Sequence, residues 1–241
     1  MSEHEQRVHL AAAYRLAAQR GWDDLVWTHI SASVPQRPNE YLINRFGLRF
    51  SEITASNLVT VDVTGKVTDG SNAPVNPSGF AIHGCVHAAR PDAVCVLHLH
   101  TFWAQAFAAT KQDLLPCSQP AMRLYKRLGR HAYEGLAFQE DEQQRMVRAL
   151  GDRDGLILEN HGVLLVGRSV AEAFILMHLF ERAVQIQLTA QSSGRELVLI
   201  DEATAALTFA QWVGPNNAQE GIDEWPALLR GLQKTDPDFS E

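Results

Sequence analysis

His98 and His100 are the first residues whose type and spacing indicate chemistry, because they stand two positions apart in an otherwise apolar segment. On a strand, side chains at this spacing project from one face, with their backbones about 6–7 Å apart. Burying two unpartnered imidazoles is costly, so their place in an apolar strand favours a shared partner. The pair is therefore predicted to bind one metal ion.

His161 is the predicted third ligand. It lies in the sequence Asn160-His161-Gly162, just after an apolar stretch. Taken alone, this sequence is equally typical of an ordinary hairpin turn, in which Gly162 would give the backbone freedom to bend sharply. Three neutral nitrogen donors with an open position are typical of a catalytic site for Zn²⁺ or another divalent transition metal.

The other histidines carry weaker signals. His29 follows an apolar and aromatic segment and is a candidate to reach the same cleft. His83 and His87 are four residues apart, on one helical face, and are expected to pack or hydrogen-bond at the helix surface, with support of the metal ligands as the alternative. Four more are expected to be surface or packing residues: His4, His9, His131 and His178.

Hydrophobic periodicity and capping residues define the elements that must position these side chains. Helices are expected over residues 5–20, 78–89, 101–110, 141–150 and 169–192, and strands over 27–34, 41–43, 58–63 and 93–100. Residues 155–166 are expected to form two strands that meet at Asn160-His161-Gly162. Gly21 is expected to end the first helix, Ser78 to cap the second, and Ser169 with Glu172 to form a capping box. The early strands are joined by turns too short for crossovers. The fold class is therefore α/β, a three-layer α/β/α sandwich around a mixed, largely antiparallel sheet.

The composition and charge of the chain exclude several classes of protein and partner. The 241 residues carry a formal net charge of −7, which argues against nucleic acid or an anionic membrane as the main partner. The first eight residues are too polar to open a secretory signal, and no run of about 18 apolar residues occurs. Three cysteines do not make a disulfide framework, so free thiols are expected at Cys85 and Cys95. These features predict one cytoplasmic domain over residues 1–241.

Several segments taken together resemble the class II aldolase/adducin family over roughly residues 5–195. They are Trp27-Thr28-His29-Ile30-Ser31, residues 41–47, 52–54, 76–79 and 90–92, the two metal-ligand segments, and residues 170–173. The resemblance implies an α/β/α sandwich, a cyclic tetramer with active sites at subunit boundaries, and a metal, usually zinc, on histidines matching His98, His100 and His161. Enzymatic members include sugar-phosphate aldolases, epimerases and decarboxylases, whereas adducin head domains share the fold and lack the enzymatic site.

The chain departs from the sugar-phosphate aldolases at three places. They carry an acidic residue after the Pro-Ser motif, a metal ligand and proton shuttle, and the corresponding place here reads Gly79-Phe80-Ala81-Ile82, with no carboxylate. A glycine-asparagine pair that helps to hold phosphate is replaced by Thr28-His29, and another phosphate loop reads Arg45-Phe46-Gly47. Ser78 and Gly79 remain, with backbone N–H groups at a helix start that suit an anion. The chain thus resembles the short bacterial adducin-like subgroup.

The resemblance and the retained histidines predict a metal-dependent lyase of aldolase or decarboxylase type. Its substrate would be a small hydroxy- or keto-carbonyl compound, a sugar-acid or sugar-phosphate derivative, converted through a metal-stabilised enediolate. Without the carboxylate, proton transfer would fall to His29, Tyr125, Tyr133 or metal-bound water, although tyrosines more often anchor packing. Substrate binding is expected at Asn44, Arg45, Ser78 and Gly79. Arg45 is equally typical of a solvated surface residue.

Two other functions remain open at this point. One is a non-catalytic, adducin-like oligomeric module that binds metal, and the other is a non-haem iron oxygenase on the same scaffold. Zn²⁺ is the expected ion, with Mn²⁺ and Fe²⁺ as alternatives. Residues 206–241, which contain Trp212 and Trp225, are expected at a subunit boundary of a homotetramer, or else to cover the protein's own sheet.

Overall fold

A single seven-stranded sheet forms the middle layer of the protein. The structure is a computed structural model that describes residues 1–136, 139–214 and 221–241, apart from the Ser78 side chain. The strand order is β3-β2-β1-β4-β7-β6-β5. The strands are β1 (His29–Ser33), β2 (Glu40–Ile43), β3 (Val59–Asp62), β4 (Cys95–Leu99), β5 (Leu128–His131), β6 (Gly155–Leu158) and β7 (Gly162–Gly167). Only β5 and β6 pair in parallel, which confirms the mixed, largely antiparallel sheet.

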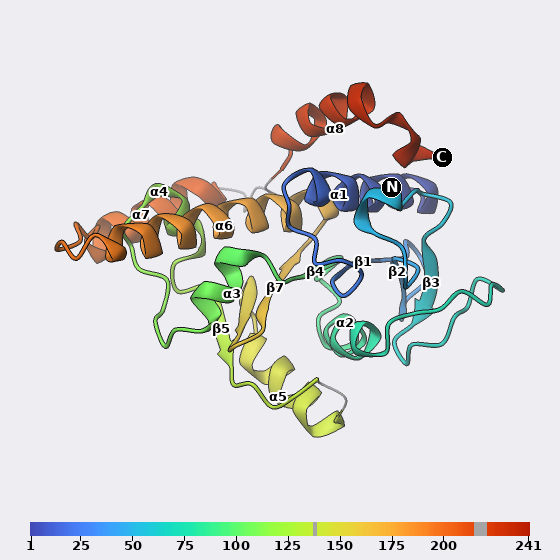
Figure 1. Cartoon of the computed structure of the whole chain (residues 1–241), viewed down its shortest axis with the longest axis horizontal. Coiled ribbons are helices and arrows are strands. Elements are labelled where there is room, and N and C mark those ends of the chain that lie inside the picture. Colours follow the sequence, from blue (N-terminus) through green and yellow to red (C-terminus); the bar gives the residue numbers. More distant parts are fainter. Residues whose placement is uncertain (137–138, 215–220) are drawn as a thin grey trace.

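Helices cover both faces of the sheet, which confirms the α/β/α sandwich (Figure 1). One face carries α1 (Glu3–Gln19), α3 (Phe102–Ala108), α4 (Gln119–Leu124) and α6 (Val170–Ser192), with α7 (Glu202–Val213) and α8 (Glu224–Thr235) packed on these helices. The other face carries α2 (Pro77–Ala89) and α5 (Glu140–Leu150). Two 3₁₀ turns, η1 (Phe50–Glu52) and η2 (Pro237–Ser240), lie against α1.

Strand β4 shows how the two cores and the site are divided. Its alternate residues Cys95, Leu97 and Leu99 enter the large core under α1 and α6, whereas Val96 enters the smaller core under α2 and α5. Because side chains alternate across a strand, His98 shares the face of Val96. The strand therefore directs its histidines into the layer that contains α2.

Most boundary residues act as the sequence predicts. Gly21 follows α1 with φ +65°, and the Ser169 hydroxyl accepts a hydrogen bond from the Glu172 N–H at the start of α6. The capping box is only half formed, because the Glu172 carboxylate turns to the backbone N–H of Arg168 instead (2.5 Å). The expectation that Ser78 caps the second helix is wrong. The helix begins one residue earlier, at Pro77, because the fixed φ of proline suits the first helical position.

The C-terminal segment packs on the protein's own core. Trp225 of α8 is 3% exposed, and its ring lies 5.5 Å from that of Phe174 in α6. Trp212 and Leu229 are half-buried against the same core. Both tryptophans therefore pack against the protein's own core.

Two further findings concern cysteine and membrane insertion. The thiols of Cys85, Cys95 and Cys117 are all free, and Cys95 is fully buried. Within the described residues, no helix combines the length and apolar character needed to cross a bilayer.

Candidate metal centre

Three histidines from two distant segments converge at one edge of the sheet. His98 is the second-last residue of β4, His100 follows the strand directly, and His161 lies in the turn between β6 and β7. Each offers one nitrogen, and these three atoms lie within 4.8 Å of one another. The pairing of β4 with β7 brings the segments together, because it aligns Leu99 with Val163.

In the β6–β7 turn, Gly162 does not provide the bend that the sequence led us to expect. The left-handed conformation is taken by Asn160, with φ +54°, whereas Gly162 lies in β7 and adopts no positive φ. Gly162 is needed for another reason: a Cβ there would lie 2.5 Å from the carbonyl oxygen of Leu99 and 3.1 Å from the His100 ring. The glycine therefore permits close approach of the turn to the end of β4.

The hydrogen bonds of His98 and His100 define which nitrogens face the centre. His98 Nδ1 lies 3.2 Å from the Val163 carbonyl oxygen, and His100 Nδ1 lies 3.0 Å from Asp24 Oδ2. These oxygens can only accept, so both Nδ1 atoms carry protons. In neutral rings the two Nε2 atoms are then bare acceptors, and they face each other at 3.1 Å.

The donor set fits a divalent cation. The Nε2 lone pairs of His98 and His100 repel each other at 3.1 Å. A cation bound between these two atoms and His161 would remove the repulsion. The rings are suited to bind metal as neutral ligands. Burial and the neighbouring His161 and His100 place the pKa of His98 well below its usual range, and burial followed by His100 lowers the pKa of His161 to about 4. Asp24 orients His100 from behind, as carboxylates commonly do for metal-binding histidines.

His29 joins this cluster as a fourth imidazole. It is the β-sheet partner of His98, and the two ring centroids are 5.2 Å apart. Its ring lies over Gly79, where a Cβ would come within 2.8 Å of His29 Cδ2 and 3.0 Å of Nε2. His29 therefore occupies the volume that a side chain at position 79 would need. Burial, with His100 and His161, lowers its pKa to about 3.

The two candidate tyrosines lie in different places. Tyr133 is 54% exposed, and its ring centroid is 6.5 Å from that of His161. It helps to line a small pocket of about 10 Å³ that also contains His161 and Glu159. Tyr125 lies instead at the end of α4, packed against the large core beside Lys126. The structure thus brings Tyr133, and not Tyr125, to the histidines.

The candidate substrate-binding residues are spread around β2 and the start of α2. Asn44 is 5% exposed, and its side-chain oxygen already accepts a hydrogen bond from the Tyr14 hydroxyl (2.8 Å). Arg45 is exposed to solvent. The Ser78 side chain lies outside the described part of the structure, and Ser78 and Gly79 belong to the first turn of α2. Asn44 therefore has a structural role in the folded chain.

His83 is buried, which its sequence pattern did not predict. We expected His83 and His87 at the helix surface, but His83 is 0% exposed and both rings bond to Ser31 of β1. The helix face that carries them is turned toward the sheet. Ser31 stands two residues after His29 and shares its face of the strand, which is the signal that would have linked the segments.

Exposed apolar side chains lie close in sequence to the histidines of the centre. Trp27 lies two residues before His29 and is 54% exposed, and Phe102 lies two residues after His100 and is 73% exposed. Leu25 and Tyr133 are also exposed. Large exposed apolar groups around one site are typical of a surface that binds another molecule.

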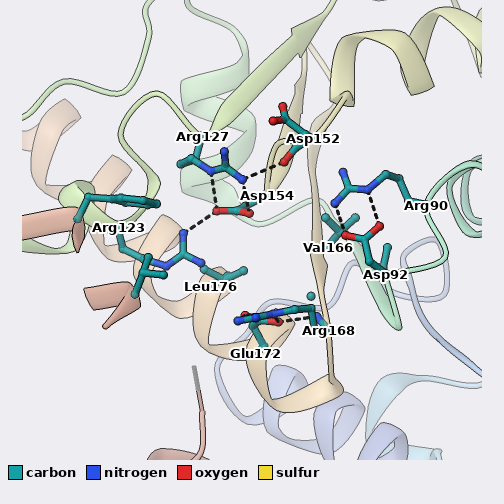
Figure 2. Close-up of a pocket in the computed structure, with 14 residues that line it drawn as sticks. Arg90, Asp92, Arg123, Arg127, Asp152, Asp154, Val166, Arg168, Glu172 and Leu176 are labelled. Carbon is teal, nitrogen blue, oxygen red and sulfur yellow. Dashed lines mark hydrogen bonds and ion pairs between the residues drawn. The ribbon is translucent and has the colours of Figure 1, made fainter. Parts of the chain in front are cut away.

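A second polar pocket lies at the opposite ends of the same strands, where β4 begins and β7 ends (Figure 2). Its volume is about 170 Å³. Figure 2 shows that its side chains point at one another: Arg123 and Arg127 both contact Asp154, Arg90 contacts Asp92, and Arg168 contacts Glu172.

Comparison with known proteins identifies the family. The family model described as the class II aldolase and adducin N-terminal domain matches residues 8–188. The chain belongs to the class II aldolase and adducin family. Within it, the chain is 44% identical over 243 residues to a Pseudomonas aeruginosa protein whose name places it among the class 2 aldolases, covering 100% of this chain and 93% of that protein.

Solved structures of family members share the fold. A crystal structure of an aldolase II superfamily protein from Pseudomonas syringae has a TM-score of 0.94 at 43% identity, with 100% of this chain and 96% of that chain covered. An L-fuculose 1-phosphate aldolase from Glaciozyma antarctica has a TM-score of 0.87 at 28% identity, with 99% and 92% covered.

Adducins are also relatives within this family. Rattus norvegicus alpha-adducin is 42% identical over 240 residues, which are 94% of this chain and 32% of that protein. The chain thus corresponds to about a third of an adducin.

Proposed function

We propose that this protein is a metal-dependent carbon–carbon lyase of the class II aldolase type. Its substrate would be a small hydroxy- or keto-carbonyl compound, such as a sugar-phosphate or sugar-acid derivative. The single observation that carries the proposal is the convergence of three imidazole nitrogens within 4.8 Å, with the Nε2 atoms of His98 and His100 facing each other at 3.1 Å. The similarity to an L-fuculose 1-phosphate aldolase supports the sugar-phosphate class.

In this proposal His98, His100 and His161 hold the cation, with Zn²⁺ as the first candidate and Mn²⁺ or Fe²⁺ as alternatives. A bound divalent cation would polarise the substrate carbonyl and stabilise the negative charge of an enediolate.

The chain's own groups would then move the protons. His29 Nε2 accepts the hydroxyl proton of the substrate, the carbon–carbon bond opens, and its electron pair stays on the enediolate fragment. The Tyr133 ring lies 6.5 Å from the His161 ring, and its hydroxyl would return a proton to carbon. Arg45 and the backbone N–H groups at the start of α2 would bind a phosphate or carboxylate handle.

The relation to alpha-adducin favours one second candidate, a metal-binding interaction module without turnover. We also propose that a homo-oligomer, a tetramer, forms through the exposed side chains of Trp27 and Phe102, with residues 206–241 near a subunit boundary. Light scattering after size-exclusion chromatography tests this, and a monomeric mass at micromolar concentration would reject it.

Elemental analysis of protein purified without added metal, followed by a screen of sugar phosphates and keto acids, tests the function. Zinc or manganese together with substrate cleavage and proton exchange supports the lyase. Bound iron with oxygen consumption indicates an oxygenase instead. Metal without any turnover indicates the interaction module.

A further inference from the structure

A continuous line of short contacts runs from His29 away from the metal centre into α2. His29 Nδ1 lies 2.7 Å from His83 Nε2, and His83 Nδ1 lies 2.5 Å from Ser31 Oγ. Ser31 Oγ lies 2.7 Å from His87 Nε2. Ser31 and His83 are 0% exposed and His29 is 2% exposed, so these contacts are shielded from water.

The outer end of this line fixes its direction. The His87 ring also bonds to the backbone of Ala93. The N–H of Ala93 already donates to the carbonyl of Arg90 (2.9 Å), which leaves the Ala93 carbonyl as the partner of His87. A carbonyl only accepts, and Nε2 faces Ser31, so Nδ1 of His87 carries the proton.

The remaining protons follow one by one. Neutral His87 has a bare Nε2, so the Ser31 hydroxyl donates to it. That hydroxyl has one hydrogen, so it must accept from His83 Nδ1. Neutral His83 then has a bare Nε2, which accepts from His29 Nδ1. His29 is left with a bare Nε2, the atom that lies over Gly79.

Burial supports the neutral forms that this sequence of bonds requires. Burial, and then the neighbouring His29 and His87, place the pKa of His83 well below its usual range. Burial lowers the pKa of His87 to about 4. Tyr41 stacks on the His87 ring, with centroids 4.8 Å apart and planes at 26°, and so fixes the orientation of the outer residue.

We propose that Ser31, His83 and His87 are positioning residues that hold His29 as its Nδ1–H tautomer and direct the Nε2 lone pair into the space above Gly79. The inference rests on the proposed function for the use of that lone pair, the acceptance of a substrate proton. The tautomer of His29 is a property of the folded chain and does not depend on the proposed function.

The test is long-range ¹H–¹⁵N correlation spectroscopy of the histidine rings in the metal-free protein. We expect His29 Nδ1 to show a protonated, pyrrole-type shift and Nε2 a bare, pyridine-type shift. In Ser31→Ala the link between His83 and His87 is cut, and His29 becomes a mixture of tautomers. His87→Phe removes the outer acceptor while retaining a ring against Tyr41, and a smaller change in the same direction is expected.

Ser33→Ala is the matched control, because Ser33 lies two residues further along the same strand and has no part in the line of contacts. It should leave the His29 signals unchanged. A protonated Nε2 on His29 in the wild-type protein would overturn the proposal. So would identical His29 shifts in Ser31→Ala, His87→Phe and wild type.

Kinetics of the metal-loaded enzyme give a second measurement. Ser31→Ala should lower kcat roughly tenfold with KM and metal content unchanged, because neither the ligands nor the anion-binding groups are altered. The lyase proposal and the positioning inference can be rejected independently of each other. If no substrate is turned over but the NMR shifts change as described, the lyase proposal fails and the positioning inference stands.

Discussion

The two ends of strands β4 and β7 hold polar clusters that differ in how their groups are partnered. At one end, His98, His100 and His161 direct bare nitrogens at one another. At the other end, Arg123 and Arg127 share Asp154, and the neighbouring arginines each have a carboxylate. Both ends are polar and partly buried, and the arginine end has the clearer cavity.

The difference shows why unsatisfied bonding capacity, rather than polarity or cavity size, identifies the candidate site. Buried ions paired with one another satisfy their bonding within the fold, whereas convergent lone pairs need a further partner. The histidine end is therefore predicted to be functional, and the arginine end to stabilise the fold.

The largest expected effect is loss of metal in His98→Ala. One of three ligands disappears, so we expect at least a hundredfold loss of metal affinity and no measurable lyase activity. Metal content is measured by mass spectrometry on protein purified without added metal. Asp154→Asn, at the opposite end, should retain the metal. Unchanged metal in His98→Ala would show that the coordination assignment is wrong.

At the arginine end, the expected effect is on stability. Asp154→Ala leaves Arg123, whose side chain is 7% exposed, without its carboxylate, and should lower the free energy of unfolding by about 3 kcal/mol. Urea denaturation measures this. Glu202→Ala is the control: it breaks the exposed Lys126–Glu202 pair, and almost no change in the free energy of unfolding is expected. Equal losses in the two variants would contradict a structural role for the buried cluster.

Asp24→Asn removes the charge behind His100 while keeping the shape of the side chain. Since such partners raise the basicity of a metal-binding imidazole, metal affinity should fall roughly ten- to hundredfold. Competition with a chelator of known affinity measures the change. The neighbouring Asp23→Asn should bind metal as the wild type does, and a similar loss there would indicate a general effect of net charge.

The smallest expected effect is a pH dependence of stability, which should arise from the buried histidines and not from Asp154. The pKa of His87 falls from 6.5 to about 4 on folding, so the unfolded chain takes up its proton first as the pH drops. His87 should therefore contribute a decrease in stability of about 1 kcal/mol between pH 7 and pH 5.5. Urea titrations in the presence of chelator measure this, and His87→Phe should show a shallower dependence.

Asp154 should not contribute in that window. Burial opposes its ionisation, but hydrogen bonds from Arg127 and the charge of Arg123 hold the pKa of this carboxyl below its usual 3.8. Its stabilisation is complete above pH 4 and is lost only at lower pH. Stability that stays flat down to pH 4 in the metal-free protein would contradict the neutral, buried state of the histidines.

Much of the fold was predictable because its signals are local. The apolar run of β4, the serine before α6 and the glycine after α1 each act within a few residues. The errors concern contacts between distant segments. Gly162 was predicted to allow a bend in the chain. In the structure, its lack of a side chain instead makes room for Leu99, which is distant in sequence. His83 was placed at the surface because a single helix does not reveal which face meets the sheet.

The sequence alone determined that His98 and His100 share a face, because side chains on a strand alternate with a period of two. Only the tertiary structure decided that His161 meets them and that His29 fills the space above Gly79. Those contacts depend on strand order and register, which arise from pairing across the whole sheet and from burial of its two faces.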